Sequence, residues 1–273
     1  MTESFYRKLR VYAYNIIGVY DDANDIVQDV LEKFMKVEKS GIDNEEAYLI
    51  RMVINSSINF KKRMKKFSTY GVWLPEPVQT GSTDSKLERE LVADYALMVL
   101  FEKLNPKERA VFILKEGFDY KHGEIAEVLD ITDANSRKLL GRAKLKLGNG
   151  ISVGKQMNRE DISPFLDALN SSDVNKLESL FSENISFSAD GGDSVQVVAT
   201  NTKGKSNISE LLVLIYVNFL KGKTYTVHIM NHQVSIIYKT PETTSSCLMF
   251  SFNEKGLISS IYSVVDPDKL KNI

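Results

Sequence analysis

The most constraining feature of this sequence is the tetrapeptide Asn-Pro-Lys-Glu at residues 105–108. Asn105 can cap a helix, and Glu108 can complete a capping box with it. Pro106 suits the first turn of that helix, because proline lacks an amide proton that this position would leave unpaired. The sequence therefore predicts a helix that begins here and runs to about Gly117.

Two further short helices are predicted after this start, with a tight turn between them. Apolar residues at helical spacing place them over 120–129 and 133–147, and Thr132 can cap the second. Asp130 stands in the turn, at a place that needs left-handed backbone and more often carries glycine. Three short helices at this spacing predict a helix-turn-helix, whose last helix can enter the major groove of duplex DNA.

Polar side chains lie opposite the apolar face of this last helix. An asparagine near a helix start can read a base edge, and an arginine can read guanine or hold a phosphate. No acidic residue occurs between Asp133 and Arg159. A solvated basic face on a core helix is the alternative, but the cap, the turn and the charge together favour DNA binding. The predicted DNA contacts are Thr132, Ala134, Asn135, Ser136, Arg137, Lys138 and Arg142.

A second basic cluster lies at the end of a helix predicted over about 44–67. The formal net charge of the chain is only −1, so local clusters must carry any affinity for DNA. Lysine and arginine fill five of the six positions from 61 to 66. Amides and an aromatic ring beside such a track suit melted DNA, in which unstacked bases can be held. A solubilising helix end is an equal alternative. The candidates are Asn55, Ser56, Asn59, Phe60, Lys61, Lys62 and Arg63.

The helix predicted before it, over about 23–34, has an acidic face. Asp22, Asp25, Asp29 and Glu32 recur at three- and four-residue spacing, opposite an apolar stripe. A solvated face explains this pattern, and a docking surface for a basic partner explains it as well.

Beyond a linker near residue 150 the sequence changes character. Short runs rich in β-branched and aromatic residues alternate with turn signals, which predicts an α+β domain with a mostly antiparallel sheet. The predicted helices are 162–169, 174–181 and 206–220. The predicted strands are 185–189, 195–199, 224–230, 234–238, 247–252 and 257–265.

Several classes of protein are disfavoured. No run of eighteen apolar residues occurs, so no membrane span is expected, and the N-terminus lacks the layout of a signal peptide. The single cysteine, Cys247, rules out an intramolecular disulfide and fits a reducing cytoplasm. No metal or cofactor site is predicted.

In this order, the segments resemble extracytoplasmic-function sigma factors, the smallest sigma factors of bacterial RNA polymerase. Residues 21–30 are similar to the helix that docks on the polymerase clamp, and 104–112 with 120–143 are similar to the domain that reads the −35 element. The resemblance implies two all-α domains, with core RNA polymerase and promoter DNA as partners, and it assigns the basic cluster to the −10 element. The implied docking residues are Asp22, Asp25, Gln28, Asp29 and Glu32.

Three short motifs are similar to those of a subgroup with a fused SnoaL-like domain, an α+β cone. Asp193 departs from that pattern, because the subgroup usually has Gly followed by Lys there. The resemblance implies that the fused domain touches the linker and regulates the protein in cis. The motifs are Trp73, Leu74, Pro75, Glu76 and Pro77; Asp190, Gly191 and Gly192; and Pro267, Asp268, Lys269 and Leu270.

The predicted boundaries are 1–68 for the −10 domain, 69–92 for the linker, 93–150 for the −35 domain and 158–273 for the SnoaL-like domain. We therefore expect an alternative sigma factor that directs core polymerase to promoters and is not an enzyme. The alternative is a cyclase- or isomerase-like or ligand-sensing domain fused to a DNA-binding module. Its acid–base candidates would be Asp190, His228 and His232. A small-molecule ligand in the C-terminal domain is compatible with both.

Overall fold

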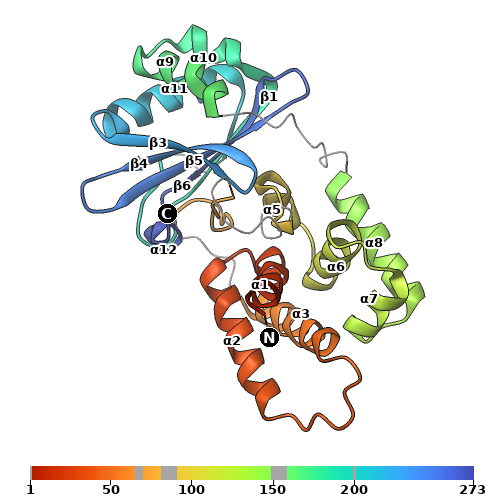
Figure 1. Cartoon of the computed structure of the whole chain (residues 1–273). Helices are drawn as coiled ribbons and strands as arrows, with labels where there is room; N and C mark the ends of the chain where they lie inside the picture. The colour runs from red at the N-terminus through yellow and green to blue at the C-terminus, as the bar shows by residue number, and fades with distance from the viewer. Residues whose placement is uncertain (1, 65–69, 81–90, 149–158, 199–200) are drawn as a thin grey trace. The chain divides into compact units, whose positions relative to one another are not determined.

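The computed structural model describes residues 2–64, 70–80, 91–148, 159–198 and 201–273 (Figure 1). The chain forms two compact units. The helical unit comprises residues 1–65 and 83–151, and the sheet unit comprises residues 66–82 and 152–273. The segment 66–82 thus belongs to the sheet unit, although it lies between the two halves of the helical unit in the sequence. No described helix is long and apolar enough to cross a membrane.

The first half of the helical unit contains α1 (Glu3–Ile17), α2 (Tyr20–Met35) and α3 (Glu45–Arg63). The Asn44 side chain caps α3 by accepting a hydrogen bond from the amide of Ala47 at 3.0 Å. Leu9, Tyr12 and Ile16 of α1 have no exposed surface, because α1 packs against both α2 and α3. The helix predicted to reach Phe67 ends at Arg63, and 65–69 lie outside the described residues.

The second half contains the predicted helix-turn-helix. Its elements are α5 (Tyr95–Phe101), α6 (Pro106–Phe112), the π-helical turn η1 (Ile113–Gly117), α7 (His122–Leu129) and α8 (Asp133–Leu147). Both hydrogen bonds of the capping box between Asn105 and Glu108 are present. Asp130 takes the left-handed conformation at φ 51°, as the turn requires. Thr132 caps α8 by accepting from the amide of Asn135.

The sheet unit is built on one mostly antiparallel sheet, as predicted. Its order is β2-β1-β6-β5-β4-β3, and the β1–β6 pair is parallel. The strands are β1 (Phe181–Asp190), β2 (Asn201–Lys203), β3 (Thr224–Met230), β4 (Gln233–Lys239), β5 (Thr244–Phe252) and β6 (Ile258–Val264). The helical elements are η3 (Arg159–Ile162), α9 (Ser163–Asn170), α10 (Val174–Leu180), α11 (Lys205–Ile215), η4 (Tyr216–Leu220) and α12 (Pro267–Leu270).

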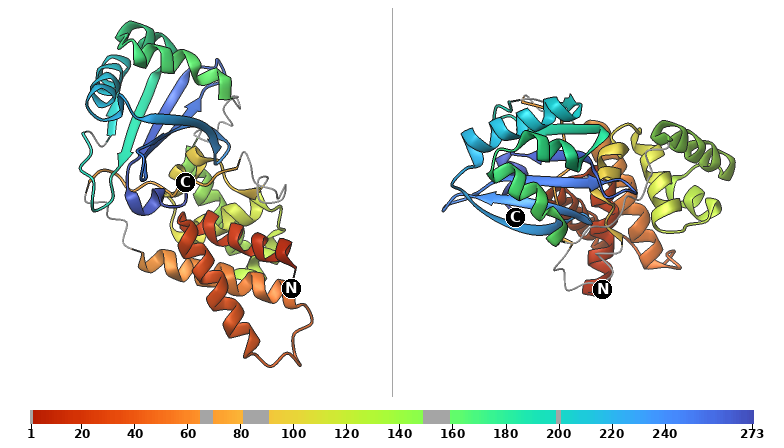
Figure 2. Two further views of the ribbon diagram at one scale, coloured as in Figure 1. Left: turned by 60° about the vertical axis from the view of Figure 1, so that its left-hand side comes forward. Right: turned by 90° about the horizontal axis from the view of Figure 1, so that it is seen from above.

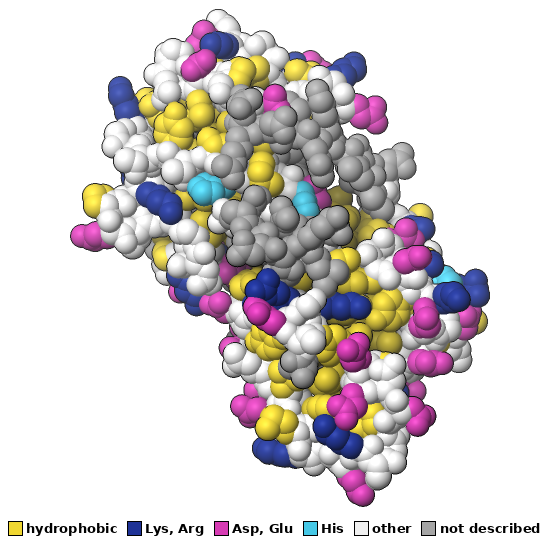
Figure 3. Space-filling view, viewed as in Figure 1, with side chains coloured by type: hydrophobic (Ala, Val, Ile, Leu, Met, Phe, Trp, Pro, Cys, Tyr) yellow, Lys and Arg dark blue, Asp and Glu magenta, His cyan; other side chains and the backbone are white. Residues whose placement is uncertain are grey.

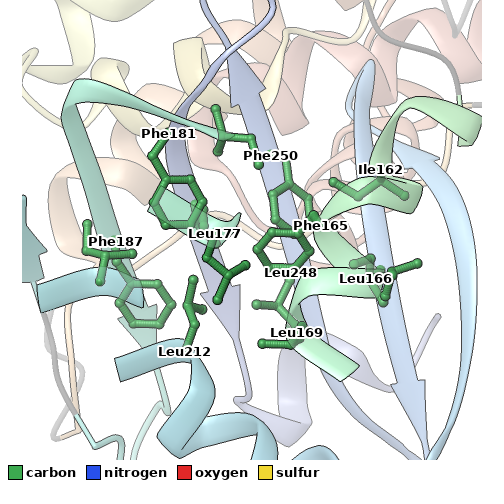
Figure 4. Packing of buried hydrophobic residues seen from close by; sticks show 14 of the residues in the cluster. Ile162, Phe165, Leu166, Leu169, Leu177, Phe181, Phe187, Leu212, Leu248 and Phe250 are labelled. Carbon is green, nitrogen blue, oxygen red and sulfur yellow. The ribbon is translucent and has the colours of Figure 1, made fainter. Parts of the chain in front are cut away.

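Helices α9, α10 and α11 cover one face of this sheet (Figure 2). The core lies between them, where Phe165 of α9 packs edge-on against Phe250 of β5 with ring centroids 4.9 Å apart (Figure 4). Leu212 of α11, Phe187 of β1 and Leu248 of β5 belong to the same buried cluster. Burying this much apolar surface on one face is what holds the sheet and its helices together.

One predicted strand is wrong. Residues 195–198 of the predicted strand 195–199 form no strand, and 199 lies outside the described residues. The amide of Val195 instead bonds back to the carbonyl of Gly191 at 2.9 Å, which turns the chain before it can pair with a neighbour. The strand in this region is the three-residue β2, which pairs with β1.

Candidate functional site

Helix α8 presents a row of exposed side chains that suits a DNA groove. Ala134, Asn135, Lys138 and Arg142 are exposed, whereas Leu139, Ala143 and Leu147 are buried. Arg137 is exposed as well, and its Nε lies 2.7 Å from Oδ1 of Asp133. Such a surface ion pair is weak, so a phosphate or a base can replace it.

The structure corrects the prediction for Ser136. This residue has no exposed surface, and its Oγ lies 2.8 Å from Nδ1 of His122 on α7. Ser136 therefore fastens α8 to α7 and cannot face DNA. The sequence pattern did not reveal this, because a polar residue near a helix start can lie on either the exposed or the buried face.

The structure also corrects Lys61 in the basic cluster of α3. The Lys61 side chain is only 2% exposed, and its Nζ lies 2.6 Å from the carbonyl oxygen of Ile17 and 3.0 Å from Oε1 of Glu102. A buried ammonium that is held in this way is not available to a phosphate. Lys62 and Arg63 remain exposed. Lys65 and Lys66 lie outside the described residues.

Glu102 pairs with a second buried cation, Arg109, which has no exposed surface. Burial lowers the pKa of the Arg109 guanidinium, and the adjacent Glu102 carboxylate counteracts this effect. The Nε of Arg109 donates to the carbonyl oxygen of Asn15 at 2.8 Å. This network of Lys61, Glu102 and Arg109, which no sequence motif indicated, joins α1 and α3 to the helix-turn-helix half of the helical unit.

Asn55, a predicted DNA contact, takes part in a second junction between the same halves. Its amide nitrogen donates to the carbonyl oxygens of Arg51 at 2.9 Å and of Val128 on α7 at 2.8 Å. Tyr12 of α1 stacks on Phe118, with ring centroids 4.0 Å apart. In this conformation the amide nitrogen of Asn55 is hydrogen-bonded within the protein and does not face DNA. The remaining candidates on α3 are the half-buried Ser56 and Phe60 and the exposed Asn59.

The acidic face of α2 is open. Asp25, Gln28, Asp29 and Glu32 are exposed, and Asp22 is half-buried. In the space-filling view, basic and acidic side chains alternate over the part of the helical unit that faces the viewer (Figure 3). The described residues thus form no broad field of one sign on this face, so recognition of DNA or of a protein depends on local clusters such as these.

Residues 70–80, which include the Trp73–Pro77 motif, lie along the sheet unit. At one end, the amide of Tyr70 donates to the carbonyl oxygen of Gly192 at 3.0 Å, and the amide of Gly191 donates back to Tyr70 at 2.7 Å. Gly71 has a φ of +113°, and a side chain there would lie 2.2 Å from the carbonyl oxygen of Ala189. This position therefore requires glycine.

The three motifs meet at one buried ion pair, which we call the linker clasp. The Nζ of Lys269 lies 2.5 Å from Oδ2 of Asp190 and 2.8 Å from the carbonyl oxygen of Leu74. The same carboxylate oxygen accepts from the amide of Leu74 at 2.7 Å. Lys269 also lies 4.7 Å from the ring centre of Trp73, a cation–π contact. Asp190 is completely buried, so the ion pair is shielded from water.

The Gly-Gly pair beside the clasp has a steric reason. Gly192 has a φ of +59°, and a side chain there would lie 2.4 Å from the carboxyl carbon of Asp266. Burial raises the pKa of the Asp266 carboxyl, and the nearby Asp190 adds to this effect. Asp190, Asp266 and Lys269 thus lie close to Gly192, where any side chain would clash.

The other end of the segment is held by residues that the sequence reasoning missed. Asn231 exchanges two 2.8 Å hydrogen bonds with Val78, one through its amide and one through Oδ1. The amide of Thr80 donates to Ile229 at 3.0 Å, and the amide of His232 donates to Oγ1 of Thr80 at 3.0 Å. Asn231 and His232 both have positive φ, and an Asn-His pair between two strand patterns was the available signal.

The three acid–base candidates contact the linker or the ion pair that holds it. Asp190 is paired with Lys269, His228 lies 3.3 Å from Nε2 of Gln79 through its Nδ1, and the backbone of His232 holds Thr80. Within the described residues, no cluster of histidine, cysteine and carboxylate side chains could hold a metal ion.

Comparison with known families identifies both helical halves. The protein-family model "Sigma-70 region 2" matches residues 1–67, and the family model "Sigma-70, region 4" matches residues 95–147. The first therefore covers α1 to α3, and the second covers the helix-turn-helix.

The chain is also similar to proteins of Mycobacterium tuberculosis over much of their length. It is 26% identical over 221 residues to the ECF RNA polymerase sigma factor SigJ of strain ATCC 25618 / H37Rv, across 77% of this chain and 70% of that relative. It is 24% identical to the probable ECF RNA polymerase sigma factor SigI of strain CDC 1551 / Oshkosh, across 70% and 69%. The crystal structure of the M. tuberculosis extracytoplasmic function sigma factor SigJ has the same fold, with a TM-score of 0.78 at 22% identity across 98% of this chain and 96% of that one.

Proposed function

We propose how the parts of this chain act together, from the premise that it belongs to the extracytoplasmic-function sigma factors of bacterial RNA polymerase. The family resemblance noted in the sequence is thereby confirmed. As a sigma factor, the protein binds the core polymerase and promoter DNA and directs the initiation of transcription. Sigma factors are not enzymes, and a cyclase or isomerase with a DNA-binding appendage is not favoured.

Three surfaces divide the recognition work in this proposal. Helix α8 reads the −35 element through exposed residues such as Asn135 and Arg142. The end of α3, with Asn59, Lys62 and Arg63, contacts the −10 element. The exposed acids of α2 dock on the core polymerase. Each assignment is supported by exposure on one face of a helix that matches a sigma-70 region.

In this proposal, the helical unit of the structure is in a closed form. The Asn55 amide bonds to α7, and Lys61 and Arg109 share Glu102, so two junctions hold the −10 and −35 halves together. A promoter separates its two elements along the duplex, and each base pair adds about 3.4 Å. Binding of both elements therefore requires these junctions to open, and opening releases Asn55 for DNA.

The sheet unit controls the linker between the two halves. The observation that carries this proposal is the buried contact of Lys269 with both Asp190 and Leu74. Residues 70–80 are fixed along the sheet unit at both ends, so this part of the linker lacks the conformational freedom of a simple tether. Fixing it limits the separations that the two DNA-reading halves can adopt.

Run-off transcription with purified core polymerase tests this control. The template would carry a promoter selected from a genomic library, in versions that differ in the spacing between the −10 and −35 elements. We expect the wild-type chain to favour one spacing. A chain that lacks residues 267–273, or that carries Trp73→Ala, should use a wider range, because the linker is released.

Lys255→Ala is the matched control, since Lys255 lies in the exposed turn between β5 and β6. It should keep the wild-type spacing profile. An unaltered profile in both the truncated chain and Trp73→Ala would disprove control by the sheet unit. It would leave the sigma-factor assignment intact.

A further inference from the structure

A cavity of about 180 Å³ opens in the sheet unit between the inner face of the sheet and η4. Its walls are mostly apolar, with Phe187 of β1, Leu248 of β5 and Phe219 of η4 among them. Figure 4 shows that Phe187 and Leu248 lie on the same side of the sheet as the core. A cavity of about 150 Å³ in another protein accepts benzene, so this one has room for a single aromatic ring.

The cavity contains a buried hydroxyl that lacks a partner. Ser246 of β5 lines it and is 3% exposed, and its Oγ has no hydrogen-bond partner in the described part of the chain. A buried polar atom without a partner destabilises a protein, and such atoms are rare. An oxygen on a bound molecule would satisfy the hydroxyl. Ser263 of β6, which is 7% exposed, also lines the cavity.

The charge at the cavity is positive. Lys223 is the one charged side chain among the described residues that line it, and it is half-buried. Among the described lining residues there is no carboxylate to repel an acid. A partly desolvated ammonium attracts an anion more strongly than a fully hydrated one does.

The walls of the cavity are connected to the linker clasp. Val195 and Val265 both line it. The amide of Val195 donates to the carbonyl oxygen of Gly191, and the amide of Val265 donates to that of Asp190 at 2.8 Å. Asp190 in turn holds Lys269 and the amide of Leu74. A molecule that displaces Val265 therefore moves the backbone of Asp190, on which the clasp depends, and one that displaces Val195 moves the adjacent Gly191.

We propose that this cavity binds a small aromatic carboxylate with a hydrogen-bonding oxygen on its ring, and that binding alters the clasp. The carboxylate pairs with Lys223, the ring fills the apolar walls, and the ring oxygen bonds to Ser246. The ligand acts as the signal for the linker control proposed above, and this regulatory part of the inference rests on that proposed function. The binding itself does not.

Isothermal titration of the full-length chain with three probes tests the binding. 4-Hydroxyphenylacetate has both polar groups, phenylacetate lacks the hydroxyl, and 4-ethylphenol lacks the carboxylate. Ser246→Ala should weaken the binding of 4-hydroxyphenylacetate about fivefold, because one hydrogen bond is lost. It should leave the binding of phenylacetate unchanged, because that probe has no ring hydroxyl. Lys223→Gln should weaken the binding of both acids and leave the binding of 4-ethylphenol unchanged. Lys221→Gln, at an exposed lysine outside the cavity lining, should behave as wild type.

The binding proposal is overturned if none of the probes gives a saturable signal at millimolar concentration. It is equally overturned if Ser246→Ala and Lys223→Gln bind all three probes as the wild type does.

Trp73 reports on the clasp, because it is the only tryptophan in the chain and lies against Lys269. With excitation at the red edge of tryptophan absorption, 4-hydroxyphenylacetate should shift the emission of Trp73 with the midpoint found by calorimetry. Lys269→Ala should abolish the shift. Constant emission at saturation would refute the coupling. Run-off transcription by the wild-type chain without probe tests the sigma function alone, so failure of either proposal is recognised separately.

Discussion

The Nζ of Lys269 lies 2.5 Å from Oδ2 of Asp190, and both side chains are shielded from solvent. These residues are 79 positions apart in the sequence. Between them they also hold the amide and the carbonyl of Leu74, so one ion pair joins three distant segments. Because an ion pair of this kind is costly to bury unless it is fully satisfied, each of its three members depends on the other two.

Asp190→Asn should destabilise the sheet unit. The change removes the nearer anion of the buried Lys269 ammonium and leaves only the Asp266 carboxylate at 3.9 Å, and breaking a buried pair costs about 3–5 kcal/mol. Urea denaturation followed by circular dichroism measures the free energy of unfolding. Asp167→Asn on the exposed face of α9 is the control and should change it by less than about 0.5 kcal/mol. Equal effects of the two variants would contradict the role of the clasp.

Glu102→Gln should destabilise the helical unit by about 3 kcal/mol or more, because it removes the one carboxylate that Lys61 and Arg109 share. Glu116→Gln breaks the exposed pair with Lys144, whose side chains are 40% and 52% exposed. Exposed pairs contribute about 0–1 kcal/mol. Chemical denaturation of both variants gives the comparison. If Glu102→Gln lowers the free energy of unfolding no more than Glu116→Gln does, the buried network does not stabilise the fold.

Arg142→Ala should weaken binding to −35 duplex DNA and reduce the slope of log affinity against log salt by about one, if this side chain holds a phosphate. Fluorescence anisotropy at several salt concentrations measures both quantities. Lys176→Ala, on α10 of the sheet unit, changes the net charge equally and should leave the slope unaffected. An unchanged slope for Arg142→Ala would remove this residue from the interface.

Glu108 should make the stability of the helical unit depend on pH. Burial alone would raise the pKa of this carboxyl, but the hydrogen bonds from Lys146 and Asn105 outweigh it, so the net shift is downward. A lowered pKa stabilises the fold at pH values above the unfolded pKa of about 4.3, and this contribution is lost as pH falls through the folded pKa. The free energy of unfolding of the wild type should therefore be larger than that of Glu108→Gln at pH 7. At pH 3 the difference between the two proteins should be smaller. A constant difference would contradict this linkage.

Local features of the fold could be predicted because their causes lie within a few residues. The capping box of Asn105 and Glu108 needs only a helix start, and the left-handed Asp130 needs only a turn. The strands 224–230 and 234–238 follow from runs of β-branched and aromatic residues, which favour extended backbone. By contrast, the predicted strand at 195–199 failed, because Val195 is captured by a bond to Gly191 that no propensity scale contains.

The class of the protein and most of its helices and strands could be predicted from the amino acids alone, since caps, hydrophobic periodicity and motif spacing are properties of short segments. The folded chain was needed to show which polar residues are exposed and which connect one part of the protein to another. Ser136, Lys61 and Asn55 have the composition of DNA contacts, yet Ser136 and Lys61 are buried, and all three bond to other parts of the protein. Likewise, Trp73–Pro77 and Lys269 were separate motifs until folding brought them to Asp190. The physical reason is that burial and pairing depend on residues far apart in the chain, and these set whether a charge is free to bind a partner.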